Sequence, residues 1–307
     1  MRIAYARAMP DSNSSSLSVL DGLRFTKGHG THNDFVMLFD EHGELDVTPE
    51  LVRVLSDRRG GIGGDGVIRA VRAGKLAAGA GFDDAMWFMD YWNADGTTSE
   101  MCGNGARVFG AYLEREAGED LTKGLTIGTR GGTRTLTALG AGQYAVGMGS
   151  WTLGDTAKGF DAEVTVAGLA HPHPALSVDV GNPHRVVALP SIDALEGLDL
   201  ATAPLVEPVP QHGTNVEFVV TRGGSMVDGE PRGRVRMRVH ERGSGETQSC
   251  GTGACAVALA VRAWAGEGAP DVWDVEVPGG LVTVRVEGDQ TTLEGPAVLV
   301  ADGILTL

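Results

Sequence analysis

The chain has 307 residues, of which 42% are hydrophobic, and it carries a formal net charge of −15. This length and apolar content allow two domains, each with its own core, while so acidic a chain repels phosphate backbones and argues against a nucleic-acid partner. The sequence contains no run of about 18 apolar residues, so we expect no membrane span.

The N-terminal segment and the cysteines bear on the cellular compartment. Residues 1–24 lack the continuous apolar stretch of a secretory signal, and residues 10–16 have the Pro, Asp, Ser and Asn content of a loop or leader. The three cysteines, at positions 102, 250 and 255, are too few for a secreted disulfide framework. Their spacing also fails to match a metal site. We therefore predict a cytoplasmic protein without a bound metal.

Taken in chain order, the elements are mostly short strands with a few helices between them. Alternating or continuous apolar residues predict strands at 35–39, 85–91, 133–138, 186–189, 215–220, 234–239 and 281–286. Helical spacing of apolar residues occurs at about 48–57, 103–116 and 251–265. This pattern favours the α+β class.

One motif occurs twice and organises the whole chain. Cys102 begins the sequence Cys-Gly-Asn-Gly-Ala, and Cys250 begins Cys-Gly-Thr-Gly-Ala, each before a helical run. Asn33 precedes Cys102 by 69 residues, and Asn182 precedes Cys250 by 68. A further matched pair, nine residues ahead of each cysteine, consists of Asn93 and Glu241.

The repeat predicts two pseudo-symmetric domains, each a curved mixed β-sheet wrapped around a central helix, with the active site in the cleft between them. We expect the N-terminal half to cover residues 1–148 and the C-terminal half to cover residues 149–296. The last strand, at 297–307, is expected to return and complete the N-terminal half.

The position of each cysteine suggests acid–base chemistry. At a helix N-terminus the first N–H groups lack helical partners and the dipole adds positive charge, which favours a thiolate and also binds carboxylates. Two such sites facing each other would place one sulfur on each side of an α-carbon, so that one takes a proton while the other donates one. A single cysteine is more often a buried apolar residue, as we expect for Cys255. The matched settings of Cys102 and Cys250 favour catalysis instead.

Several blocks around these cysteines resemble the diaminopimelate epimerase family, over a stretch from about Phe25 to Gly303. The blocks are KGHGTHNDFV at 27–36, GIGGDG at 61–66, NADG at 93–96, MCGNG at 101–105, GNPH at 181–184, NVEF at 215–218, and ERGSGET at 241–247 leading into CGTG at 250–253. The resemblance implies interconversion of LL- and meso-diaminopimelate, on the path to lysine and peptidoglycan, without a cofactor. It leaves the oligomeric state, including a homodimer, open.

The resemblance also implies roles for individual residues. Cys102 and Cys250 would be the two bases. The backbone of four residues would bind the reacting carboxylate, namely Gly103, Asn104, Gly251 and Thr252. The side chains expected to hold the substrate and its distal amino-acid end are Asn33, Asn93, Asn182, Asn215, Glu241 and Arg242. An arginine suits a distal carboxylate, a glutamate suits an ammonium, and asparagine both donates and accepts hydrogen bonds.

Other interpretations remain open at this point. His184 is expected near Cys102 as an assistant in proton transfer, or else as a structural histidine. The chain could be another two-cysteine racemase, acting on proline, hydroxyproline or histidine, although Arg242 and Glu241 favour a substrate with a second amino-acid end. It could also be a non-catalytic ligand-binding protein on the same scaffold. Three features depart from the family: His32 stands where glycine is usual, Gly66 stands where some members have a polar residue, and the leader is longer than usual.

Overall fold

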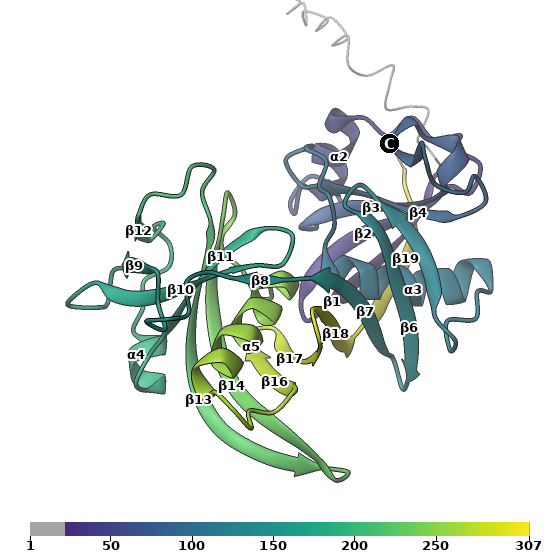
Figure 1. Ribbon diagram of the computed structural model, residues 1–307. Helices are drawn as coiled ribbons and strands as arrows, with labels where there is room; N and C mark the ends of the chain where they lie inside the picture. Colours follow the sequence, from purple (N-terminus) through teal and green to yellow (C-terminus); the bar gives the residue numbers. More distant parts are fainter. Residues whose placement is uncertain (1–21, 307) are drawn as a thin grey trace, which may run out of the picture.

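Two helices form the centres of the molecule, and strands surround each of them (Figure 1). The structure is a computed structural model that describes residues 22–306, so the loop or leader expected over residues 10–16 lies outside the described part. The first helix, α3, spans Gly103–Ala117, and the second, α5, spans Gly251–Ala265. Both are buried along most of their length, which is why their sequences consist largely of Gly, Ala, Val and Leu.

The strands around the two helices follow the same plan. Those around α3 are β1 (Arg24–Gly30), β2 (Asn33–Phe39), β3 (Gly66–Arg72), β4 (Trp87–Asn93), β5 (Leu125–Thr129), β6 (Gly132–Gly140) and β7 (Gln143–Ser150). Those around α5 are β10 (His173–Asp179), β11 (Pro183–Ala188), β13 (Asn215–Val227), β14 (Glu230–Glu241), β16 (Val272–Val277), β17 (Gly280–Glu287) and β18 (Gln290–Pro296).

Successive neighbours in both series pair in the same directions: antiparallel, parallel, antiparallel, parallel, antiparallel and antiparallel. The two halves that the cysteine motifs indicate therefore also share the same order of strand pairing. The expected α+β class, with mixed sheets around central helices, is confirmed.

Two strands connect the halves. β18 pairs antiparallel with β7, and β19 (Val298–Ile304) pairs antiparallel with β1, so the end of the chain adds a strand to the first sheet. We propose that the first half comprises residues 1–148 together with residues 297–307, and that the second half comprises residues 149–296. The end of β7 at Ser150 suits a boundary near residue 148. The pairing of β19 with β1 supports this assignment.

The remaining elements are short and lie between the strands of the two series in the chain. They are α2 (Pro49–Ser56), η2 (Ala73–Lys75), η3 (Ala77–Gly79), β8 (Thr152–Leu153), β9 (Ala162–Thr165), α4 (Ile192–Glu196), β12 (Leu205–Glu207) and β15 (Gly245–Glu246). The helix expected at 48–57 is α2, which begins after Thr48, whose hydroxyl accepts a hydrogen bond from the N–H of Leu51. Within residues 22–306, every helix is too short or too polar to cross a lipid bilayer.

Candidate active site

Cys102 and Cys250 occupy equivalent places at the starts of the two central helices. Each is the N-cap residue, with an extended backbone, and each sulfur accepts a hydrogen bond from the N–H three residues further on. The N–H of Gly105 lies 3.4 Å from the Cys102 sulfur, and the N–H of Gly253 lies 3.3 Å from the Cys250 sulfur. A thiol thus replaces the Ser or Asp oxygen that usually caps a helix.

The two helix starts lie against each other. A Cβ atom built on Gly251 would lie 3.4 Å from Cα of Gly103 and 3.6 Å from N of Asn104. It would also lie 2.9 Å from Cδ2 of Leu293, which comes equally close to a Cβ on Gly103. A side chain at either position would press against Leu293, and one at position 251 would also touch the start of α3, so glycine at both positions suits this close approach.

Backbone N–H groups that lie outside the helical ladders gather at this contact. The helical ladders begin with the N–H of Ala106 bonding to Cys102 and the N–H of Ala254 bonding to Cys250. Ahead of them, the N–H groups of Gly105 and Gly253 bond the two sulfurs, and the remaining ones belong to Gly103, Asn104, Gly251 and Thr252, the four residues expected to bind a carboxylate. Two abutting helix N-termini concentrate donors and positive dipole ends at one place, which suits an anionic group.

Asn33, the first residue of β2, connects that strand to the start of α3. Its Oδ1 accepts hydrogen bonds from the Cys102 thiol at 3.5 Å and from Nδ2 of Asn104 at 3.2 Å. Its Nδ2 donates to Oδ2 of Asp65 at 2.7 Å. Asn93, at the end of β4, is less directly connected, because its Nδ2 donates to Thr97 of its own turn at 3.1 Å.

Asn182 plays the corresponding part at the second helix start. Its Nδ2 donates to Thr252 Oγ1 at 3.3 Å, and that hydroxyl lies 3.5 Å from the Cys250 sulfur. Its Oδ1 lies 2.9 Å from Nε2 of His184, whose Nδ1 lies 2.6 Å from Glu217 Oε1. The matched asparagines of the repeat therefore lie at matched places in the structure.

His184 belongs to the second half of the molecule, and its expected part in proton transfer near Cys102 stays a prediction. His184 is fully buried on β11, and its two ring nitrogens form hydrogen bonds with Asn182 and Glu217. Asn182 in turn donates to Thr252, so these contacts connect the His184 ring to the start of α5.

Glu241 is the last residue of β14, and Arg242 follows it in the turn. Glu241 accepts a hydrogen bond from the Thr247 hydroxyl. The backbone N–H of Arg242 donates to Asn215 Oδ1 at 2.9 Å. The Arg242 side chain is exposed, and its Nη1 donates to the carbonyl of His212 at 2.8 Å, so the structure does not bring this guanidinium into contact with either cysteine motif.

Burial opposes ionisation of both thiols. It raises the pKa of Cys102 to about 11 and raises the pKa of Cys250 well above its usual range. The N–H groups of Gly105 and Gly253 lower these pKa values, as expected at helix starts, whereas the Glu241 carboxylate raises both. The expectation that the thiols ionise more easily than a free thiol is therefore wrong for this state of the protein, since desolvation outweighs the helix-start donors.

Sequence reasoning missed two carboxylates that orient the site. Asp65 accepts from Asn33 and also pairs with Arg58 at 2.7 Å. Glu217 is fully buried, and its Oε1 would lie 2.9 Å from a Cβ on Gly253. A signal for Glu217 was available, because a carboxylate inside a buried apolar strand must have a partner.

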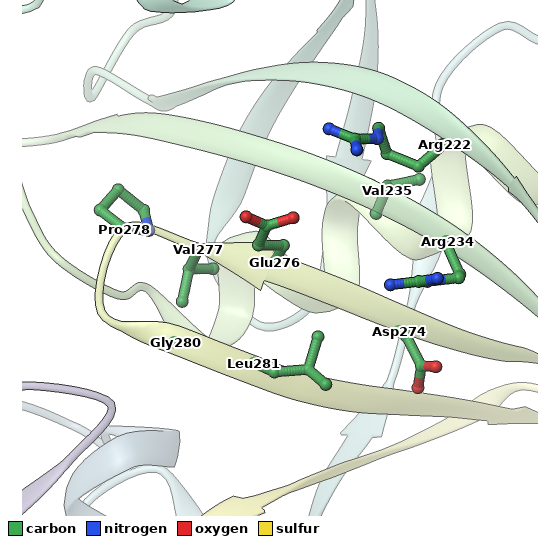
Figure 2. Close-up of a pocket in the computed structure, with 9 residues that line it drawn as sticks. All are labelled: Arg222, Arg234, Val235, Asp274, Glu276, Val277, Pro278, Gly280 and Leu281. Carbon is green, nitrogen blue, oxygen red and sulfur yellow. The ribbon is translucent and has the colours of Figure 1, made fainter. Parts of the chain in front are cut away.

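A separate groove of about 450 Å³ lies on the second sheet (Figure 2). Its polar lining comes from β13, β14 and β16, and consists of Arg222, Arg234, Asp274 and Glu276. None of the residues predicted for the site lines it, so the candidate active site is the contact between the helix starts.

Comparisons with known proteins place this chain beside one family of enzymes. The model of the family described as diaminopimelate epimerase matches residues 25–153 and 176–300. A diaminopimelate epimerase of Streptomyces coelicolor is 45% identical over 291 residues, covering 92% of this chain and 94% of the relative. One of Corynebacterium glutamicum is 42% identical over 285 residues, covering 91% and 96%.

Solved structures share the fold at much lower identity. A phenazine biosynthesis protein of the PhzF family from Bacillus anthracis superposes with a TM-score of 0.62 at 15% identity, covering 93% of this chain and 99% of its own. A hydroxyproline epimerase from Agrobacterium vitis, solved with bound trans-4-hydroxy-L-proline, superposes with a TM-score of 0.57 at 13% identity, covering 92% and 90%.

Proposed function

Since the chain belongs to the diaminopimelate epimerase family, we propose that it interconverts LL- and meso-diaminopimelate by proton transfer at one α-carbon. The observation that carries this proposal is the pair of cysteines that cap two abutting helix starts. Binding alone would not require a thiol on each side, and this argues against a non-catalytic ligand-binding protein.

The proposed reaction uses Cys102 and Cys250 as opposed acid and base. One sulfur, as thiolate, removes the α-proton, and the thiol on the other face donates its own proton to the carbon. Each turnover therefore inverts the carbon and exchanges the roles of the two sulfurs. In the free protein both thiol pKa values are raised, so a bound substrate's ammonium group and the helix-start donors must favour the thiolate.

The reacting carboxylate would bind the backbone N–H groups of the two helix starts, at Gly103, Asn104, Gly251 and Thr252. Negative charge develops on this carboxylate as the proton leaves, and preorganised donors stabilise it. Asn33 and Asn182, each in contact with one helix start, would fix the orientation of the bound amino acid. This division assigns the same task to equivalent residues of the two halves.

The distal amino-acid end would bind near the end of β14. We assign its carboxylate to Arg242 and its ammonium to Glu241, with Asn93 and Asn215 as further hydrogen-bonding partners. For this the Arg242 guanidinium must leave the His212 carbonyl when substrate binds. His184, held between Asn182 and Glu217, would assist proton transfer near Cys102.

A second candidate is a racemase of proline, hydroxyproline or histidine, favoured by the fold shared with a hydroxyproline epimerase. Such substrates have no second amino-acid end, so Arg242 and Glu241 would have no distal carboxylate or ammonium group to bind. We further assign the protein to the cytoplasm, where its thiols stay reduced, and to the synthesis of lysine and peptidoglycan precursors. A homodimer is compatible with this function.

The test is turnover by the purified protein in deuterated water. Diaminopimelate should be inverted and gain deuterium at the α-carbon, while proline, hydroxyproline and histidine should not. Inversion of one of these three, with diaminopimelate unchanged, would replace the proposal with the second candidate.

A further inference from the structure

Arg107 is a fully buried cation one turn into α3, and the proposed mechanism gives it no part. Its Nη2 donates to Asn104 Oδ1 at 3.0 Å and to Thr31 Oγ1 at 3.2 Å, and its Nε donates to the carbonyl of Pro296 at 3.3 Å. Within residues 22–306, its buried Nη1 has no hydrogen-bond partner. A buried guanidinium that bonds neutral oxygens costs desolvation energy, and such a group calls for an explanation.

The backbone around Arg107 leaves room for the guanidinium. A Cβ atom on Gly30 would lie 3.0 Å from Nη2 of Arg107 and 2.9 Å from the carbonyl oxygen of Asn104. A Cβ atom on Gly295 would lie 3.3 Å from Cζ of Arg107. Two strands, β1 and β18, thus carry glycine at the points where they pass this side chain.

Thr31, the main partner of Arg107 outside α3, is held in an unfavourable conformation. It lies at the tip of the β1–β2 hairpin with a φ of 49°, a value that β-branched residues rarely adopt and that costs about 1–3 kcal/mol. Its hydroxyl accepts from Arg107 and donates to Ser249 Oγ at 2.7 Å. The hairpin tip of the first half is therefore bonded to the residue that precedes Cys250.

These contacts close into a ring. Asn104, whose Oδ1 accepts from Arg107, donates its Nδ2 to the carbonyl of Ser249 at 2.9 Å. The ring therefore runs from Arg107 to Thr31, Ser249, Asn104 and back. Asn104 lies two residues after Cys102, and Ser249 lies directly before Cys250, so the ring joins the two segments that carry the sulfurs.

We propose that Arg107 and Thr31 are positioning residues that hold the Cys250 segment against the start of α3 and so set the separation of the two sulfurs. The inference rests on the proposed function, in which both sulfurs must reach one carbon. Arg107 orients both the Thr31 hydroxyl and the Asn104 amide, and these two groups make the bonds to Ser249. Cys255 of the second half occupies the position equivalent to Arg107, five residues after the motif cysteine. The arginine-centred ring of hydrogen bonds therefore has no counterpart at that position of the second half.

The first test removes one hydroxyl. Thr31→Val keeps the β-branched shape but cannot bond Ser249, so the Cys250 sulfur should be displaced while the Cys102 sulfur still reaches the α-carbon. In deuterated water, with the isomer whose α-proton Cys102 removes, we expect inversion to fall about tenfold or more, since misplacement by a fraction of an ångström is costly. Deuterium incorporation with retained configuration should persist.

Two variants control for a merely structural effect. Thr31→Ser keeps the hydroxyl and should retain the wild-type ratio of inversion to exchange. Thr26→Val removes another buried hydroxyl from the same β1–β2 hairpin, where it donates to Asp302 at 2.6 Å, and should also leave the ratio unchanged. An unchanged ratio in Thr31→Val would overturn the proposal.

The second test needs no substrate. Diamide takes two protons and two electrons from a pair of thiols, which form a disulfide while the reagent is reduced to its hydrazine. We expect Thr31→Val and Arg107→Met to link Cys102 to Cys250 about tenfold more slowly than the wild type and Thr31→Ser. Equal rates in folded Thr31→Val would contradict the positioning role. A wild type that links normally but does not invert diaminopimelate would contradict the proposed function instead.

Discussion

Gly251→Ala should disturb the contact between the helix starts without removing any polar group. The added Cβ would lie 2.9 Å from Cδ2 of Leu293 and 3.4 Å from Cα of Gly103. Apolar carbons in good contact lie about 3.5–4.0 Å apart, so the helix start or Leu293 must move by roughly 0.5 Å. We expect overpacking to cost about 1–3 kcal/mol of unfolding free energy.

The catalytic effect should exceed the loss of stability. The backbone N–H of residue 251 is kept, but a small misplacement of one sulfur relative to the other is expected to lower kcat for diaminopimelate inversion by about 10²-fold. Kinetic measurements on the variant, together with urea unfolding, separate the two effects. Gly147→Ala is the matched control, because its Cβ would meet nothing closer than Thr135 N at 3.9 Å.

A second substitution tests the cause. Leu293→Val shortens the side chain that the new Cβ meets, so Gly251→Ala combined with Leu293→Val should recover part of the lost activity. A Gly251→Ala protein with wild-type kcat would refute the close approach of the two helix starts. A double variant no better than the single one would mean that Leu293 is not the obstacle.

Three further predictions concern charge and redox state. Because the Glu241 carboxylate raises the pKa of both catalytic thiols, Glu241→Gln should shift the pH dependence of thiol alkylation in the free protein to lower pH, and an unshifted profile would contradict its place beside the sulfurs. Arg242→Met should weaken diaminopimelate binding by about 2 kcal/mol, the low end for losing one partner of a charge pair; unchanged kinetics would make Arg242 a surface residue. Mild oxidation should link Cys102 to Cys250 reversibly and inactivate the enzyme, with Cys255 left reduced because it is fully buried along α5; peptide mapping that finds Cys255 in the disulfide would disprove this placement.

Local patterns in the sequence predict much of this fold. The two cysteine motifs, each followed by a run of small apolar residues, mark the starts of α3 and α5, and the alternating runs mark the strands that cover them. The β13–β14 hairpin extends further than predicted, because its outer part around Gly223–Met226 is exposed and carries no apolar periodicity. The two-residue strands β8 and β15 are too short to leave any pattern.

The candidate site is less fully predictable, because its properties depend on contacts between distant segments. The register of the repeat identifies Asn33 and Asn182, since equivalent positions in a repeated fold face equivalent neighbours. No local signal reveals that His184 bonds Glu217 or that Arg107 reaches Thr31, which lies in the distant turn between β1 and β2. The raised pKa values of the thiols follow from burial between the two halves, which is a property of the assembled structure.

The central claim is that two cysteines act on opposite faces of one carbon, and isotope exchange in single-cysteine variants tests it most directly. Cys102→Ala and Cys250→Ala should each keep the wild-type circular dichroism spectrum and each fail to invert diaminopimelate. In deuterated water one variant should exchange the α-hydrogen of the LL configuration only, and the other that of the reacting carbon in the meso isomer only, both with retention. Inversion at the wild-type rate by either variant would contradict the two-base mechanism.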